Sequence, residues 1–121
     1  MRRTIAGNAL DTDAAMPWIA ACRTDELAEG RGLGVTVTDA DGVENAIALF
    51  RSEGGLYALE DRCPHRGARL SPGPVYEPCK VACLDHGWSI DLRSGLADAP
   101  ECGSVRTYPV RCEGDRVYVC L

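Results

Sequence analysis

Residues 63–88 read CPHRGARLSPGPVYEPCKVACLDHGW, and this stretch decides the fold. It contains Cys-x-His at Cys63 and His65 and then, after seventeen intervening residues, Cys-x-x-His at Cys83 and His86. The whole chain has only two histidines, and each follows a cysteine at a spacing that suits metal ligation. We therefore expect two loops, each supplying one thiolate and one imidazole, to meet at a single metal centre.

Two cysteines and two histidines satisfy two kinds of centre. In a mixed-ligand [2Fe–2S] cluster one iron takes two thiolates and the other takes two imidazoles, which raises the potential relative to an all-cysteine cluster. The same four ligands also satisfy a tetrahedral structural zinc, although zinc modules seldom begin with Cys-x-His. The cluster is the preferred interpretation, with Cys63, His65, Cys83 and His86 as its expected ligands.

Composition limits the other possibilities. A chain of 121 residues with 45% hydrophobic content is one domain long, and a net charge of −5 with a single lysine leaves no basic surface for nucleic acid. No stretch approaches the roughly 20 apolar residues of a membrane-spanning helix, and polar residues interrupt the N-terminal segment where a signal peptide would need an apolar run. We expect a cytoplasmic protein with a flexible extension over residues 1–16 and a domain over residues 17–121.

The remaining sequence predicts an all-β domain. Short β-branched or alternating runs, separated by glycine-containing turns, cover residues 34–38, 46–51, 56–59, 80–82, 89–91, 105–111 and 116–120. No convincing long amphipathic helix is present. This spacing of strands is typical of an antiparallel sandwich or barrel, from which the two cysteine-histidine segments project as loops.

The cysteine-histidine segments resemble those of Rieske proteins. Residues 61–68 (DRCPHRGA) and 83–88 (CLDHGW) carry the resemblance, which implies an antiparallel β-sandwich or barrel, of the Rieske iron–sulfur protein type, with a small cluster-binding subdomain formed by two loops. Residues 90–95 (IDLRSG) and 103–111 (GSVRTYPVR) look more narrowly like the small subunit of NAD(P)H-dependent assimilatory nitrite reductase.

That narrower resemblance implies an electron-transfer subunit of an oxidoreductase that reduces nitrite to ammonia on a large subunit containing flavin and siroheme. The small subunit has no substrate site of its own, and we assign no catalytic residue because both histidines are expected ligands. The alternative is a Rieske ferredoxin that serves an aromatic-ring dioxygenase. A structural zinc module is the alternative from a different class.

Departures from other Rieske proteins predict the properties of the cluster. Respiratory Rieske proteins carry an extra cysteine in each loop, where this chain has Ala68 and Asp85, so no disulfide is expected between the loops. They also place hydroxyl groups at the positions of Trp88 and Ile90, and the lack of those hydrogen bonds predicts a potential near the low end of the Rieske range, about −150 mV. Leu84 replaces a proline found in many relatives.

The other residues of interest receive weaker assignments. Gly67 and Gly87 are either turn glycines or positions where backbone amides approach the cluster sulfurs. Trp88 is expected to pack in the core, with shielding of the cluster from water as the alternative. Arg66 and Arg69 are expected to be solvated, and the alternatives are that they face a redox partner or tune the electric field at the cluster. No metal role is assigned to the five remaining cysteines, which are Cys22, Cys79, Cys102, Cys112 and Cys120. The alternative for Cys79, which forms Cys-x3-Cys with Cys83, is a replacement thiolate, but that choice leaves the spacing of His86 without a reason. For Cys102 a free buried thiol is preferred, and the alternative is a place on a third loop that covers the cluster.

Overall fold

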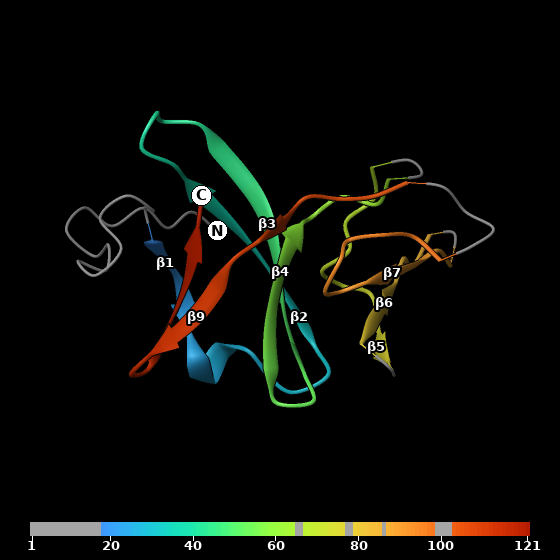
Figure 1. Ribbon diagram of the computed structural model, residues 1–121, viewed down its shortest axis with the longest axis horizontal. Coiled ribbons are helices and arrows are strands. Elements are labelled where there is room, and N and C mark those ends of the chain that lie inside the picture. Colours follow the sequence, from blue (N-terminus) through green and yellow to red (C-terminus); the bar gives the residue numbers. More distant parts are fainter. Residues whose placement is uncertain (1–17, 65–66, 77–78, 86, 99–102) are drawn as a thin grey trace.

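The protein is built from ten β-strands and one short 3-10 turn among the described residues (Figure 1). The structure is a computed structural model that describes residues 18–64, 67–76, 79–85, 87–98 and 103–121. The elements are β1 (Trp18–Arg23), η2 (Thr24–Glu26), β2 (Gly32–Thr38), β3 (Glu44–Ser52), β4 (Gly55–Glu60), β5 (Val75–Tyr76), β6 (Lys80–Ala82), β7 (Ser89–Asp91), β8 (Thr107–Tyr108), β9 (Val110–Glu113) and β10 (Arg116–Cys120). Over these ranges no helix has the length and apolar character needed to cross a membrane.

The strands form three antiparallel sheets. One sheet has the order β1-β10-β9, the second β2-β3-β4-β8 and the third β5-β6-β7. In Figure 1 the first two sheets stand at the left and centre, and the small third sheet lies beyond β4 at the right. The all-β, antiparallel prediction is confirmed, with the β5-β6-β7 sheet forming the small subdomain next to the cysteine-bearing loops.

Strand β3 separates two hydrophobic cores. Residues Ile47, Ala48, Leu49 and Phe50 are all fully buried, and alternate side chains of a strand point to opposite faces. Ile47 and Leu49 belong to the first core, which lies between the two large sheets. Ala48 and Phe50 belong to the second core, which is shared with the small subdomain. Burial on both faces explains why the sequence here is a continuous apolar run rather than an alternating one.

A tight turn fixes the register of the hairpin that follows. Ser52 pairs with Gly55, and the two residues between them, Glu53 and Gly54, both have positive φ values of 52° and 80°. Two consecutive residues with positive φ are typical of the type I′ turn, whose twist matches the twist of the paired strands. The Gly54-Gly55 sequence predicts a turn here, and the structure places that turn one residue earlier, at Glu53 and Gly54, with Gly55 already in β4.

The predicted strand over residues 105–111 is wrong as a single element. Tyr108 pairs with Ala58 of β4, whereas Val110 pairs with Val119 of β10, so the chain passes from one sheet to the other at Pro109. Proline has no N–H to donate to a ladder, which makes it a suitable point for this change of sheet. The sequence also gave no separate signal for β5, which has only two residues.

Candidate metal centre

The first cysteine-bearing loop is a tight turn that starts at Cys63. The Cys63 N–H donates to the carbonyl of Ala68 at 2.6 Å, and the Gly67 N–H donates back to the Cys63 carbonyl at 2.8 Å. These two bonds bring the beginning and the end of the loop together at Cys63, Gly67 and Ala68. His65 and Arg66 lie outside the described residues.

The second loop repeats the hydrogen bonds of the first, position for position. The Cys83 N–H donates to the carbonyl of Trp88 at 2.8 Å, and the Gly87 N–H donates to the Cys83 carbonyl at 2.8 Å. His86 lies outside the described residues. The two segments, whose cysteines are twenty residues apart, thus share the same pair of backbone hydrogen bonds at the cysteine. Their histidines differ in position, because His65 is the second residue after Cys63 and His86 is the third after Cys83.

The loop glycines are required by backbone conformation. Gly67 and Gly87 have φ values of +76° and +74°, in a region that side chains other than glycine seldom adopt. Their N–H groups donate to cysteine carbonyls, so the turn-glycine interpretation is supported, and these two bonds give no support to amides directed at cluster sulfurs.

Both loop cysteines are buried in the same core. Cys63 and Cys83 each expose only 1% of their surface and belong to the hydrophobic cluster that also contains Phe50 and Ile90. Two buried thiols at equivalent positions of two similarly built loops fit the thiolate half of a mixed-ligand [2Fe–2S] set, because one iron of such a cluster takes two cysteine thiolates. The imidazole half rests on the sequence spacing.

Asp61 fixes the first loop to the chain that follows it. Its side chain is buried and accepts hydrogen bonds from the N–H groups of Leu70 and Ser71 at 2.7 and 2.8 Å, and from the Ser71 hydroxyl at 2.8 Å. The carboxyl group therefore joins the residue two before Cys63 to the residues that leave the loop. Sequence reasoning did not single out Asp61, because an aspartate that precedes Leu70 and Ser71 by nine and ten residues is not a recognisable motif.

A third segment, of which the structure describes residues 97–98 and 103, touches both loops at Gly103. A Cβ placed on Gly103 would lie 3.0 Å from Cβ of Pro64 and 3.7 Å from the ring of Trp88, so the backbone at Gly103 packs closely against one residue of each loop. Trp88 is half-buried and packs on the second core, which supports its predicted packing role. Cys102, interpreted as a free buried thiol with a third loop over the cluster as the alternative, lies outside the described residues.

The other cysteines differ in their surroundings. The sequence patterns place Cys112 and Cys120 in strands, where buried cysteines act as small hydrophobic residues. Cys120 is buried, as is Cys22, but Cys112 is exposed, and its thiol lies 3.5 Å from the Gly114 carbonyl in the turn after β9. Cys79 is buried at a positive φ of 117° beside Tyr57. The hydrogen bond between the Cys79 thiol and the Tyr57 hydroxyl raises the pKa of that phenol.

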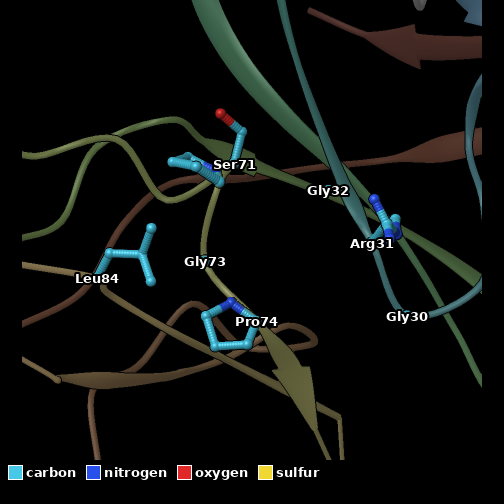
Figure 2. A pocket seen from close by; sticks show the side chains of 8 residues that line it. Gly30, Arg31, Gly32, Ser71, Gly73, Pro74 and Leu84 are labelled. Carbon is cyan, nitrogen blue, oxygen red and sulfur yellow. The ribbon is translucent and has the colours of Figure 1, made fainter.

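The outer side of the second loop is exposed and bordered by a groove. Leu84 exposes 62% of its surface, more than any other large hydrophobic residue in the described ranges. Figure 2 shows it at one side of a groove of about 470 Å³, opposite Arg31, with Ser71 and Pro74 along the groove. The residue next to Cys83 is therefore open to contact with another molecule. Arg69, a candidate partner-facing residue, is also exposed.

Comparisons with known proteins agree with this geometry. A family model described as the Rieske [2Fe–2S] domain matches residues 17–109. The ferredoxin component of the naphthalene 1,2-dioxygenase system of Pseudomonas aeruginosa is 40% identical over 105 residues, which are 86% of this chain and 95% of the relative.

Solved structures give the same result. A Mycobacterium tuberculosis protein described as an NADH-dependent nitrite reductase small subunit superposes with a TM-score of 0.75 and 30% identity, covering 88% of this chain and 96% of that one. A ferredoxin of Sphingomonas yanoikuyae B1 superposes with a TM-score of 0.72 and 25% identity, covering 86% of this chain and 98% of that one.

Proposed function

Because the chain belongs to the Rieske [2Fe–2S] family and so carries a Rieske-type cluster in an electron-transfer domain, we propose that it is the electron-donating component of a larger oxidoreductase. The observation that supports this role best is the exposed Leu84 beside the buried Cys83. A short path between the metal centre and the surface suits a protein that passes single electrons to a docked partner, because the partner can approach within one side chain of the ligand loop.

We propose Cys63, His65, Cys83 and His86 as the ligands. When bound, the cluster accepts and releases one electron. The protein's own contribution is to fix the two cysteines by the paired hydrogen bonds at the loop bases and to shield the sulfur side within the second core.

The ligand proposal is tested by matched substitutions. Cys83→Ser and His65→Ala should abolish the EPR signal of the dithionite-reduced protein and lower its iron and sulfide content. Cys79→Ser is the control, because Cys79 is also buried in the same core and lies only four residues before Cys83. If Cys79→Ser loses the signal and Cys83→Ser retains it, the second thiolate has been misassigned.

The small subunit of assimilatory nitrite reductase is one specific candidate for this component. It is supported by residues 90–95 and 103–111 and by the superposition on the M. tuberculosis protein, which has the higher TM-score of the two structures compared above. In that role the acceptor is a large subunit that contains flavin and siroheme.

The ferredoxin of an aromatic-ring dioxygenase is the second specific candidate. It is supported by the 40% identity to the naphthalene dioxygenase ferredoxin component, which extends over nearly the whole of that relative. Sequence identity thus favours this candidate, whereas backbone superposition favours nitrite reductase.

Electron delivery separates the two candidates. The reduced protein should be mixed under anaerobic conditions with a nitrite reductase large subunit and nitrite, or with a terminal dioxygenase, and its reoxidation followed by visible absorption. The correct acceptor should reoxidise the protein at a rate that rises with acceptor concentration and saturates. Reoxidation no faster than in buffer with either acceptor would contradict both candidates.

A further inference from the structure

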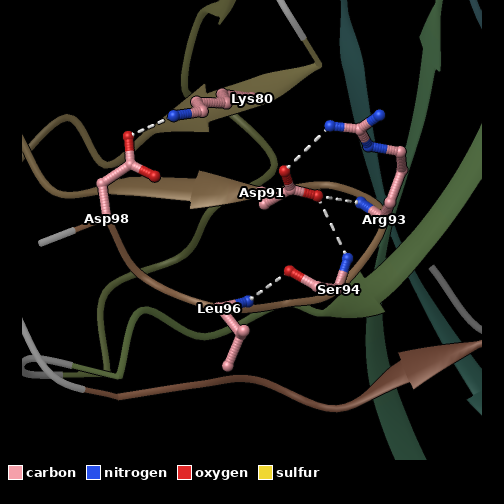
Figure 3. A network of polar contacts seen from close by, with 6 residues as sticks. All are labelled: Lys80, Asp91, Arg93, Ser94, Leu96 and Asp98. Atoms are coloured by element: carbon pink, nitrogen blue, oxygen red, sulfur yellow. Dashed lines mark hydrogen bonds and ion pairs between the residues drawn. The ribbon is translucent and has the colours of Figure 1, made fainter.

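Lys80 forms an ion pair that joins the small sheet to the third segment. It is the only lysine of the chain and lies on β6, where its amino group contacts the Asp98 carboxylate at 2.5 Å (Figure 3). Both side chains are partly shielded, with exposures of 23% and 38%. The hydrogen bond from Lys80 to Asp98 raises the pKa of Lys80, so the amino group stays charged under ordinary conditions.

A second carboxylate is available to Lys80 but is already engaged. Asp91 lies directly opposite Lys80 in the pairing of β6 with β7. Its oxygens instead accept hydrogen bonds from the Arg93 guanidinium and from the N–H groups of Arg93 and Ser94, as Figure 3 shows. Lys80 therefore makes its contact across the loop, with Asp98.

Asp98 belongs to the segment that touches both cysteine-bearing loops. The Asp98 N–H donates to the Ser89 carbonyl at 2.9 Å, and the neighbouring Ala97 N–H donates to the Gly103 carbonyl at 3.0 Å. Gly103 in turn packs against Pro64 and Trp88. A short chain of contacts thus leads from Lys80 through Asp98, Ala97 and Gly103 to the first and second loops.

We propose that Lys80 and Asp98 are positioning residues that hold the backbone at Ala97 and Gly103 against the two cysteine-bearing loops. By keeping this contact closed, the pair limits the access of water to the metal centre. Solvent exposure is one of the quantities that set the potential of an iron–sulfur cluster, so the pair also tunes that potential. Neither effect depends on which oxidoreductase accepts the electron.

The direction in which the reduction potential changes distinguishes positioning from a direct electrostatic effect. Removing the positive charge of Lys80 should by itself lower the potential, and removing the negative charge of Asp98 should raise it. Loss of positioning should raise the potential in both variants. It lets more water reach the cluster, and water stabilises the reduced cluster, which carries one more negative charge than the oxidised one.

The experiment compares Lys80→Gln, Asp98→Asn and the exchanged double variant Lys80→Asp/Asp98→Lys, all with the cluster loaded. Hydrogen exchange of the Ala97 and Asp98 amides should be about fivefold faster in both single variants, as expected from the upper range for a partly exposed ion pair. Their potentials should both rise, and the exchanged variant should restore both quantities toward those of the parent protein.

Arg93→Gln is the matched control. It breaks the ion pair with Asp91 on the neighbouring turn, where the Asp91 carboxylate accepts hydrogen bonds from Arg93 and Ser94. It should leave the exchange of the Ala97 and Asp98 amides unchanged.

The proposal would be overturned by potentials that shift in opposite directions in the single variants, by unchanged amide exchange, or by an equal effect of Arg93→Gln. If the single variants fail to hold the cluster, the exchanged variant decides the outcome: a loaded cluster supports positioning, and an empty protein contradicts it. Both readouts are taken on the purified carrier, so failure to find an acceptor leaves this test intact.

Discussion

Asp61→Ala removes the acceptor that ties the entry and exit of the first loop together. In the parent protein the buried carboxyl group accepts from the N–H groups of Leu70 and Ser71 and from the Ser71 hydroxyl. Alanine leaves these donors buried without a partner. We expect a large loss of stability, concentrated at the base of the loop that begins at Cys63.

The size of the loss follows from the donors. Each stranded buried donor costs about 1–3 kcal/mol, and the two backbone N–H groups cannot turn away, whereas the hydroxyl can rotate. The expected loss is therefore about 2–6 kcal/mol, compared with about 5–15 kcal/mol for the total stability of a domain. Asp61→Asn retains one oxygen for both N–H groups, and Ser71→Ala removes a single bond, so each of these should cost about 1 kcal/mol.

Urea unfolding followed by far-UV circular dichroism measures these differences, and the half-time of bleaching of the visible absorption reports on the metal centre. Asp61→Ala should show both the lowest unfolding free energy and the fastest bleaching of the three variants. If Asp61→Ala lies within 1 kcal/mol of Asp61→Asn, the carboxyl group does not fix the loop in the way that its contacts indicate.

Four further substitutions give three separate tests. Gly73→Ala should lower the stability measured by thermal unfolding by about 2–3 kcal/mol, because the new Cβ would lie 2.0 Å from the carbonyl oxygen of Ala82. Gly87→Ala should lower it by only about 1–2 kcal/mol, because the space around Gly87 is open and only its φ of +74° is unfavourable for alanine. Equal losses in the two variants would contradict this difference. Cys22→Ser, in the core away from the loops, should leave the EPR spectrum unchanged, and an altered spectrum would give Cys22 a metal role. Burial alone would raise the pKa of Asp91, but hydrogen bonds from Arg93 and from backbone N–H groups outweigh it and lower that pKa. The stability lost in Asp91→Asn, about 0.5 kcal/mol, should therefore be constant above pH 3.8 and vanish as the pH falls below it, in melting curves recorded across that range.

Most strands could be predicted because their sequence patterns are local. The predicted runs 80–82, 89–91 and 116–120 coincide with β6, β7 and β10, and the runs 34–38, 46–51 and 56–59 each lie within an observed strand. Strand β1 was not predicted as a separate run, since Ala20, Ala21 and Cys22 have little β preference and its pairing with β10 includes a bulge between Ala20 and Cys22. Long-range pairing, which local patterns do not contain, determines that strand.

The cysteine-bearing loops were predictable because spacing and residue type encode them directly. What surrounds the loops was not. The contacts of Asp61 with Ser71 and of Lys80 with Asp98 join residues ten and eighteen positions apart, and nothing in their identity indicates those partners. The matching hydrogen bonds of the two loops also became visible only in the structure, since their sequences between cysteine and glycine differ.

The two-sided burial of β3 has a practical consequence for protein engineering. A designer who grafts the two cysteine-bearing loops onto a foreign scaffold must also transfer the central strand β3, whose opposite faces are both buried. Trimming the chain to its right-hand part in Figure 1 would expose Ile47 and Leu49 to solvent. The smallest part of the chain that can be transferred with both cores intact is therefore almost the entire domain.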